Sequence, residues 1–189
     1  METLSKPSTM ASSANEAVGK LSADREMVKL FRDAALLDAI ATYERSLVTP
    51  GSRFDRWLLG DASAITQEEL SGYQHFKSLG CISCHQGVNV GGNLFQRHGI
   101  FRSIGSPDPE MVRVPSLRNL ATTPPYFHDG STATLSEAVK KMGFAQLDRV
   151  LTDQQIAAII GFLNTLTGTY QGKAVRAPTA TPDEATALP

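Results

Sequence analysis

Cysteine is scarce in this chain of 189 residues, and no long hydrophobic run occurs in it. Two cysteines are too few for a small scaffold held together by disulfides. No apolar stretch approaches the length of a membrane-spanning helix, so a membrane span is not expected. The formal net charge of −1 argues against a nucleic-acid-binding protein, which would carry a basic surface. A hydrophobic fraction of 41% is ordinary for a globular protein, so we expect one domain with polar tails.

Both cysteines belong to one short motif, Cys81-Ile82-Ser83-Cys84-His85. The pattern Cys-x-x-Cys-His is the attachment signature of a c-type haem. One helical turn separates the two thiols by the spacing of the two vinyl groups on one porphyrin edge, and the following histidine then falls beneath the ring. The motif therefore predicts one covalently attached haem c, with His85 as the proximal ligand of its iron.

Three other uses of the two cysteines are weaker. A zinc site needs two more ligands, and the sequence offers neither a second cysteine pair nor a His-x-His cluster. A thioredoxin-like redox pair needs a βαβ setting, whereas the flanks of this motif are typical of helix and loop. A disulfide across two intervening residues would close a loop too small to stabilise the fold much.

Apolar spacing and capping signals predict an all-α domain with long loops, wrapped around the haem. We expect residues 1–21 to be a leader or linker, 22–170 the cytochrome c domain, and 171–189 an extended or disordered tail. Within the domain we expect five helices. The first begins after Ser22, the second ends at about Val48, the third runs from Thr66 to Gly80, the fourth runs from Leu135 to Met142 and is closed by Gly143, and the fifth begins at Thr152. Thr66, Thr134 and Thr152 each precede a Glu or Gln by three residues, which predicts three capping boxes. Residues 86–125 are rich in Gly and Pro and predict a long loop that wraps the porphyrin.

The second axial ligand of the iron is less well defined by the sequence. The candidates are Met111, Met142, His75, His98 and His128. Met142 is favoured because it is expected to end a helix, where Gly143 would let the chain turn away while the thioether points back. A core methionine at a helix end is the plain alternative. His98 would instead give bis-histidine ligation and a lower potential.

Several further motifs, in the right order, resemble the C-terminal domain of bacterial di-haem cytochrome c peroxidases. The resemblance covers roughly residues 7–170, and the segments that carry it are 41–50, 54–56, 59–61, 84–92, 115–120, 125–130, 138–147 and 151–153. In that family this domain holds the high-potential haem, which receives electrons and passes them to a second, peroxidatic haem. The resemblance implies that Cys81 and Cys84 hold the haem and that His85 and Met142 ligate it.

The resemblance also implies other ligands and partners. Backbone carbonyls of Thr123 and Pro125 match ligands of a calcium ion that the family binds between its domains. His128 matches a histidine near that domain interface, and Arg113 and Arg118 are candidate partners of the haem propionates, with solvated surface arginines as the alternative. A small redox protein is the expected electron donor, and a peroxidatic haem domain or a second copy of the chain is the expected further partner.

The chain departs from the family in having one haem motif where the enzyme needs two. An iron with both axial positions filled cannot bind peroxide without losing a ligand, so we expect an electron carrier. A peroxidase that works with a partner or an N-terminal haem domain, and a haem-based sensor, are the alternatives. Covalent haem attachment in bacteria predicts a periplasmic location, although Met1 to Ala17 lacks the apolar run of a secretory signal. We expect either a removed signal or a fragment of a longer protein.

Overall fold

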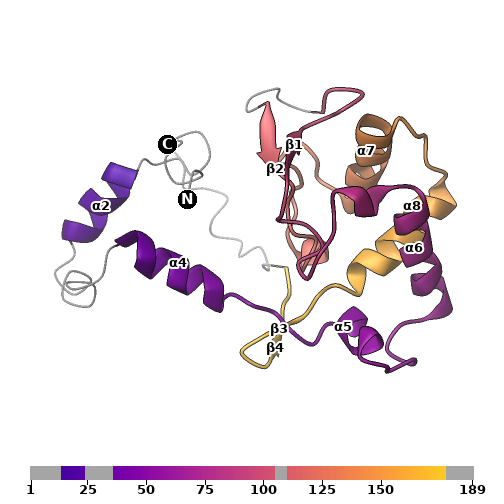
Figure 1. Cartoon of the computed structure of the whole chain (residues 1–189), viewed down its shortest axis with the longest axis horizontal. Coiled ribbons are helices and arrows are strands. Elements are labelled where there is room, and N and C mark those ends of the chain that lie inside the picture. Colours follow the sequence, from indigo (N-terminus) through magenta and orange to yellow (C-terminus); the bar gives the residue numbers. More distant parts are fainter. Residues whose placement is uncertain (1–13, 24–35, 105–109, 178–189) are drawn as a thin grey trace, which may run out of the picture. The chain divides into compact units, whose positions relative to one another are not determined.

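The computed structural model describes residues 14–23, 36–104 and 110–177, and the chain divides into two units, 1–48 and 49–189. The first unit contains α2 (Ala14–Ala23) and α4 (Leu36–Ser46) (Figure 1). The helix α4 confirms the one expected before Val48, whereas α2 was not predicted. The helix expected after Ser22 falls mainly on residues 24–35, which lie outside the described residues.

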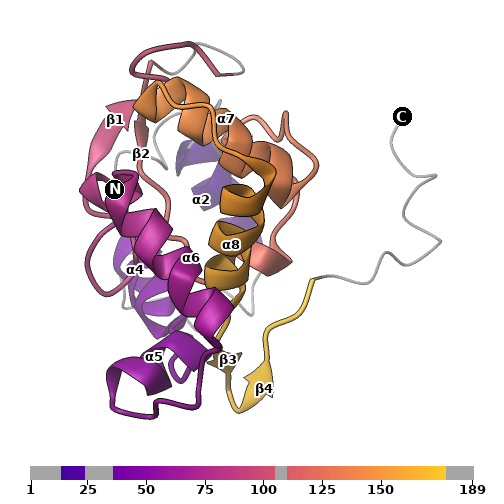
Figure 2. The ribbon, with the colours of Figure 1, turned by 90° about the vertical axis from the view of Figure 1, so that its right-hand side faces the viewer.

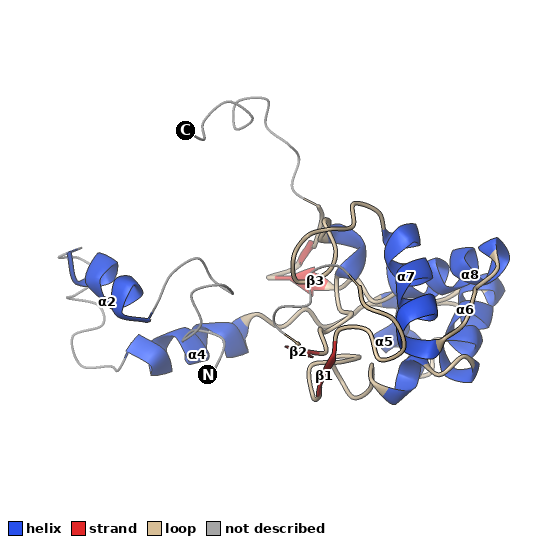
Figure 3. Ribbon diagram, turned by 90° about the horizontal axis from the view of Figure 1, so that it is seen from above, coloured by secondary structure: helices blue, strands red, loops and turns tan. Residues whose placement is uncertain are grey.

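The second unit is mostly helical and holds the haem motif. Its helices are α5 (Arg53–Leu58), α6 (Gln67–Ser78), η2 (Cys81–Ser83), η3 (Leu120–Thr122), α7 (Leu135–Leu147) and α8 (Asp153–Asn164). Its strands are β1 (Phe95–Arg97), β2 (Met111–Arg113), β3 (Thr169–Tyr170) and β4 (Lys173–Ala174), which form two antiparallel ribbons, β1 with β2 and β3 with β4. The predicted fold class is therefore confirmed as a mostly helical domain, with a few short strands added (Figure 3).

The core of this unit forms where α6 packs along α8, with α7 also against α8 (Figure 2). Ile159, Phe162 and Leu163 of α8 face this core and are almost completely buried. Gly72 of α6 allows the close approach, because a Cβ at this position would overlap the Ala158 carbonyl of α8. The α6–α8 pair thus forms the rigid base from which the chain continues into the haem motif.

The predicted capping boxes are only partly confirmed. The Thr66 and Thr152 hydroxyls each accept a hydrogen bond from the backbone amide three residues on. In return, the backbone N–H of each threonine donates to a side-chain oxygen of Glu69 or Gln155. At Thr134 only half of the box forms, with the hydroxyl accepting from the Glu137 amide.

The predicted end of α7 at Gly143 is wrong. The helix continues to Leu147, and its C-cap, Asp148, has a left-handed φ of 51°. Gly143 is buried inside the helix, where its missing side chain makes room for Leu151. Tertiary packing therefore outweighs the cost of about 1 kcal/mol for glycine in a helix interior.

The described part of residues 86–125, which leaves out 105–109, forms the expected long loop, interrupted by β1, β2 and η3. Backbone hydrogen bonds tie this loop to α7, where the Phe101 and Arg102 N–H groups both donate to the Ala145 carbonyl, at 2.9 and 3.3 Å. Among the helices that the structure describes, none is both long and apolar enough to cross a membrane.

Candidate haem site

The haem motif begins where α6 ends. Gly80 takes a left-handed φ of 104°, which lets the chain leave the helix and start the 3₁₀ turn η2 at once. The His85 amide donates to the Cys81 carbonyl at 3.1 Å, and the Ser83 hydroxyl donates to the Gly80 carbonyl at 2.7 Å. This single turn therefore presents two thiols and one imidazole within five residues.

Both cysteines are free thiols and are half-buried. Burial raises the pKa of the Cys81 thiol to about 11, so this thiol is protonated at neutral pH. Among the described residues, no group of three His, Cys, Asp or Glu side chains is placed to hold a metal ion, which weakens the zinc alternative further.

The His85 imidazole is enclosed by protein on the side of its Nδ1 atom. A Cβ on Gly91 would overlap the Pro115 carbonyl and lie 3.3 Å from Nδ1, so glycine is required there, with its φ of 133°. The Phe76 ring lies 6.3 Å from the imidazole, centroid to centroid. These three neighbours fix the ring between the end of α6 and the loop.

Nδ1 of His85 is buried, and no hydrogen-bond partner meets ordinary geometry. Burial lowers the pKa of His85, and the nearby backbone carbonyls of Pro115 and Val90 offset only part of this effect. The two carbonyls thus lie near the imidazole, and neither forms a hydrogen bond of ordinary geometry with Nδ1. A neutral imidazole wedged in this way is the form that ligates iron, so the residues present fit a haem.

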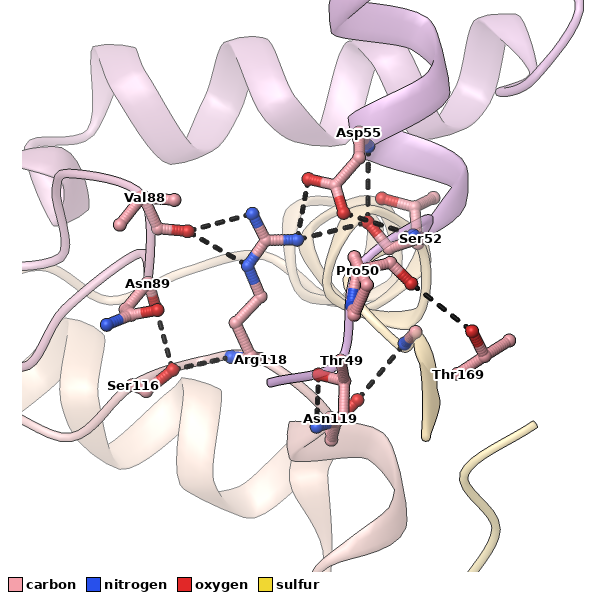
Figure 4. Close-up of polar contacts among 12 residues, drawn as sticks. Thr49, Pro50, Ser52, Asp55, Val88, Asn89, Ser116, Arg118, Asn119 and Thr169 are labelled. Carbon is pink, nitrogen blue, oxygen red and sulfur yellow. Dashed lines mark hydrogen bonds and ion pairs between the residues drawn. The ribbon is translucent and has the colours of Figure 1, made fainter. Parts of the chain in front are cut away.

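Hydrogen bonds join residues 88–92, in the loop after the motif, to residues 114–118. Gly92 N–H donates to the Val114 carbonyl at 2.8 Å, and Leu117 N–H donates to the Val90 carbonyl at 3.2 Å. The Ser116 hydroxyl donates to the Asn89 carbonyl at 2.7 Å. Arg118 donates to the Val88 carbonyl from Nε at 3.0 Å and from a terminal nitrogen at 2.8 Å (Figure 4). The wall behind His85 is therefore built from two segments, residues 88–92 and 114–118, that are joined by hydrogen bonds.

The two arginines considered as propionate partners have protein partners of their own. The remaining terminal nitrogen of Arg118 lies 2.7 Å from Asp55 Oδ1 and 3.1 Å from the Ser52 hydroxyl (Figure 4). Burial alone would raise the pKa of Asp55, but hydrogen bonds from Arg118 and Ser52, together with the Arg118 charge, hold it below its ordinary value. Nε of Arg113 donates to the Gly92 carbonyl at 2.8 Å.

The candidate axial ligands lie on different elements. Met142 is half-buried in the middle of α7, so the predicted turn at Gly143 no longer supports its assignment, which rests on the resemblance. Met111 is on β2 and 48% exposed, and His75 is half-buried on α6. His98 and His128 pack edge to face with their ring centroids 4.7 Å apart, and His98 also contacts the Phe127 ring at 5.3 Å.

His98 is the more deeply placed of this histidine pair. Its Nδ1 is buried without a partner of ordinary geometry. Burial and the neighbouring His128 lower the pKa of His98, opposed in part by Asp129 and by the Ile104 carbonyl. The pair therefore joins the loop after β1 to residues 126–130.

The expected calcium ligands lie in an exposed turn. Thr123 and Pro125 are exposed, the bond between Pro124 and Pro125 is cis, and the Thr123 hydroxyl donates to the Leu120 carbonyl at 3.2 Å. Calcium binding at this turn stays a prediction.

Sequence reasoning missed the residues that shape the site without ligating anything. Gly72 and Phe76 lie within the helix predicted from Thr66 to Gly80, and Gly91 lies within the family segment 84–92, but the sequence assigns none of the three a role at the site. The adjacent glycines that follow the haem motif, Gly91 and Gly92, were the one available signal.

Comparisons with known proteins match two families along this chain. The family described as di-haem cytochrome c peroxidase matches residues 1–63, and the cytochrome c family matches residues 70–167. A cytochrome c551 peroxidase of Nitrosomonas europaea is 40% identical over 87% of this chain and 56% of its own length. The cytochrome c peroxidase Ccp of Escherichia coli K12 is 36% identical over 87% of this chain and 41% of its own length.

A solved structure is also similar. It is the crystal structure of a MauG-like protein associated with microbial copper homeostasis, and it is 26% identical with a TM-score of 0.60 over 83% of this chain and 63% of the other. The chain spans about half the length of the curated relatives named above. Its cytochrome c domain implies covalently bound haem c. This chain belongs to the di-haem cytochrome c peroxidase family and contains one cytochrome c domain of that family.

Proposed function

We propose that this chain carries one haem c, attached at Cys81 and Cys84 and ligated by His85 and Met142, and that it transfers electrons. The observation that supports this best is the enclosure of His85. Its Nδ1 is buried against Gly91 and Pro115, which leaves the other ring nitrogen as the one available to a metal.

The haem would supply a one-electron iron couple at this site. The protein's part is to hold the ligands and to exclude water. Phe76 and the loop backbone shield the imidazole, and a thioether from Met142 favours ferrous iron and so raises the potential. A shielded site whose ligands stay in place needs little reorganisation, which suits a carrier.

The experiment is a spectroscopic and redox titration of the purified holoprotein. A carrier gives a six-coordinate ferric spectrum with the weak near-infrared band of methionine–iron bonding, a high potential, and no turnover of hydrogen peroxide. A five-coordinate iron that readily binds cyanide or peroxide would reject this proposal in favour of catalysis or sensing.

Peroxide reduction is the second candidate, because both curated relatives named above are peroxidases. This chain would then act as the electron-accepting half, with the peroxidatic haem on another domain, another protein or a second copy. Turnover that appears only when such a haem protein is added would support this candidate.

We also propose a periplasmic location and a small redox protein as electron donor. Both follow from covalent haem attachment in bacteria and from the bacterial peroxidases that the chain resembles. Fractionation of cells that express the natural gene, followed by detection of the protein in the periplasmic fraction, tests the location.

A further inference from the structure

Arg118 lies at one end of the two hydrogen-bonded segments, residues 88–92 and 114–118, and joins them to α5. Its guanidinium spans from the Val88 carbonyl, three residues after His85, to Asp55 and Ser52 at the start of α5 (Figure 4). Ser52 is 1% exposed, so this end of the contact is buried. The loop that carries the back wall of His85 is therefore anchored to the core at this point.

We propose that Arg118 is a positioning residue for His85, acting through the loop of residues 86–91, and that it thereby sets the reduction potential of the haem. This rests on the proposed function, in which His85 ligates the iron. Arg118 reaches the loop at the Val88 carbonyl, and Gly91, three residues farther along the loop, is the residue that lies against the His85 imidazole.

The geometry of the contact requires arginine. Two nitrogens of one guanidinium meet the same carbonyl oxygen, while a third meets a carboxylate and a hydroxyl. A planar guanidinium offers donors in these fixed directions, whereas a lysine ammonium would keep the charge and lose the fork. The side chains of Arg118 and Asp55 are only 16% and 21% exposed, so water screens this ion pair less than one on the surface.

A loosened loop has a predictable effect on the potential. Release of Val88 would loosen the backbone around Gly91, whose close contact with Pro115 holds the imidazole. Water reaching His85 would stabilise the more highly charged ferric state and lower the potential.

The experiment compares Arg118→Lys and Asp55→Asn with the wild-type holoprotein. Two quantities are measured, the potential by redox titration and hydrogen exchange of the Val90 and Gly91 amides, which bond to the Gly87 and Gln86 carbonyls at 2.9 Å. Arg118→Lys keeps the charge, so we expect a lower potential together with exchange faster on the order of tenfold, as for loss of a charge-assisted hydrogen bond.

Asp55→Asn distinguishes a positioning role from a direct effect of charge, because the two shift the reduction potential in opposite directions. Removing a negative charge would raise the potential if the charge acted through space. A weakened anchor for Arg118 lowers it. A raised potential with unchanged exchange in this variant would therefore overturn the proposal.

The matched control is Arg53→Lys. Arg53 makes a similar two-pronged contact with Glu69, at 2.6 and 2.7 Å, but it does not touch the loop of residues 86–91. We expect neither the potential nor the loop exchange to change in this control.

The outcomes are distinguishable from failure of the proposed function. If the wild-type spectrum shows no histidine–methionine haem, the proposed function fails. If that spectrum is present but Arg118→Lys leaves either the exchange or the potential unchanged, the positioning role of Arg118 is wrong.

Discussion

Gly72 of α6 lies directly against the Ala158 carbonyl of α8, so closely that any side chain at position 72 would overlap that carbonyl. Gly72 and the Ala158 carbonyl are both parts of helix backbones, and a helix backbone cannot move aside as the end of a flexible side chain can. The contact therefore sets how near the two core helices approach each other, and with it the position of the chain that enters the haem motif.

Gly72→Ala is expected to destabilise the protein by about 3 kcal/mol. The methyl group would force α6 and α8 apart, and this overpacking outweighs the gain in helix propensity of up to about 1 kcal/mol. Denaturant unfolding of the holoprotein measures the change in the free energy of unfolding. The matched control is Gly161→Ala on α8, where a Cβ would meet only the Glu69 side chain at 3.8 Å, and which should be neutral or stabilising by up to about 1 kcal/mol.

Gly91→Ala tests the wall behind His85. The new methyl group would overlap the Pro115 carbonyl and press on Nδ1 of the imidazole, so we expect a loss of roughly 3 kcal/mol and a shifted spectrum of the ferric protein. Gly92→Ala is the control, because Gly92 also has a positive φ but nothing lies within 4 Å of its Cβ position. That control should lose only the backbone strain of about 1–2 kcal/mol, with an unchanged spectrum. Equal losses in the two variants would show that the wall is unimportant.

Met142→Ala tests the distal ligand. If the thioether ligates the iron, the variant loses the near-infrared band of methionine–iron bonding and its potential falls, because a ligand that favours ferrous iron is gone. Visible and near-infrared spectroscopy with a redox titration measures both effects. Met111→Ala, on the exposed face of β2, should leave both unchanged. An intact band in the Met142 variant would reject this ligand.

His98 should make the protein less stable in mild acid. Burial and His128 lower the pKa of His98 in the folded protein, while in the unfolded chain it stays near the ordinary 6.5. As pH falls through 6.5, the unfolded chain therefore binds the proton first, and stability is lost until the folded pKa is reached. Thermal unfolding between pH 7 and 5 should show a smaller loss in His98→Gln than in the wild type. Parallel curves would show that His98 does not contribute.

Local patterns in the sequence were enough for the haem motif and for most helix starts. Cys-x-x-Cys-His and the capping pairs at Thr66 and Thr152 depend on atoms three or four residues apart, so the chemistry is complete within one turn. The Gly- and Pro-rich composition likewise predicted the long loop of residues 86–125, and the family motifs identified the domain.

Only the tertiary structure decided where α7 ends, what Arg118 binds, and how His98 and His128 pair. Gly143 stays helical because Leu151 fills the space beside it, and Arg118 meets Asp55, 63 positions earlier in the chain. Such contacts join residues far apart in sequence, and their free energies outweigh local preferences of about 1 kcal/mol. Five consecutive residues are thus enough to specify the haem motif, whereas the packing that orients His85 forms only when the chain folds.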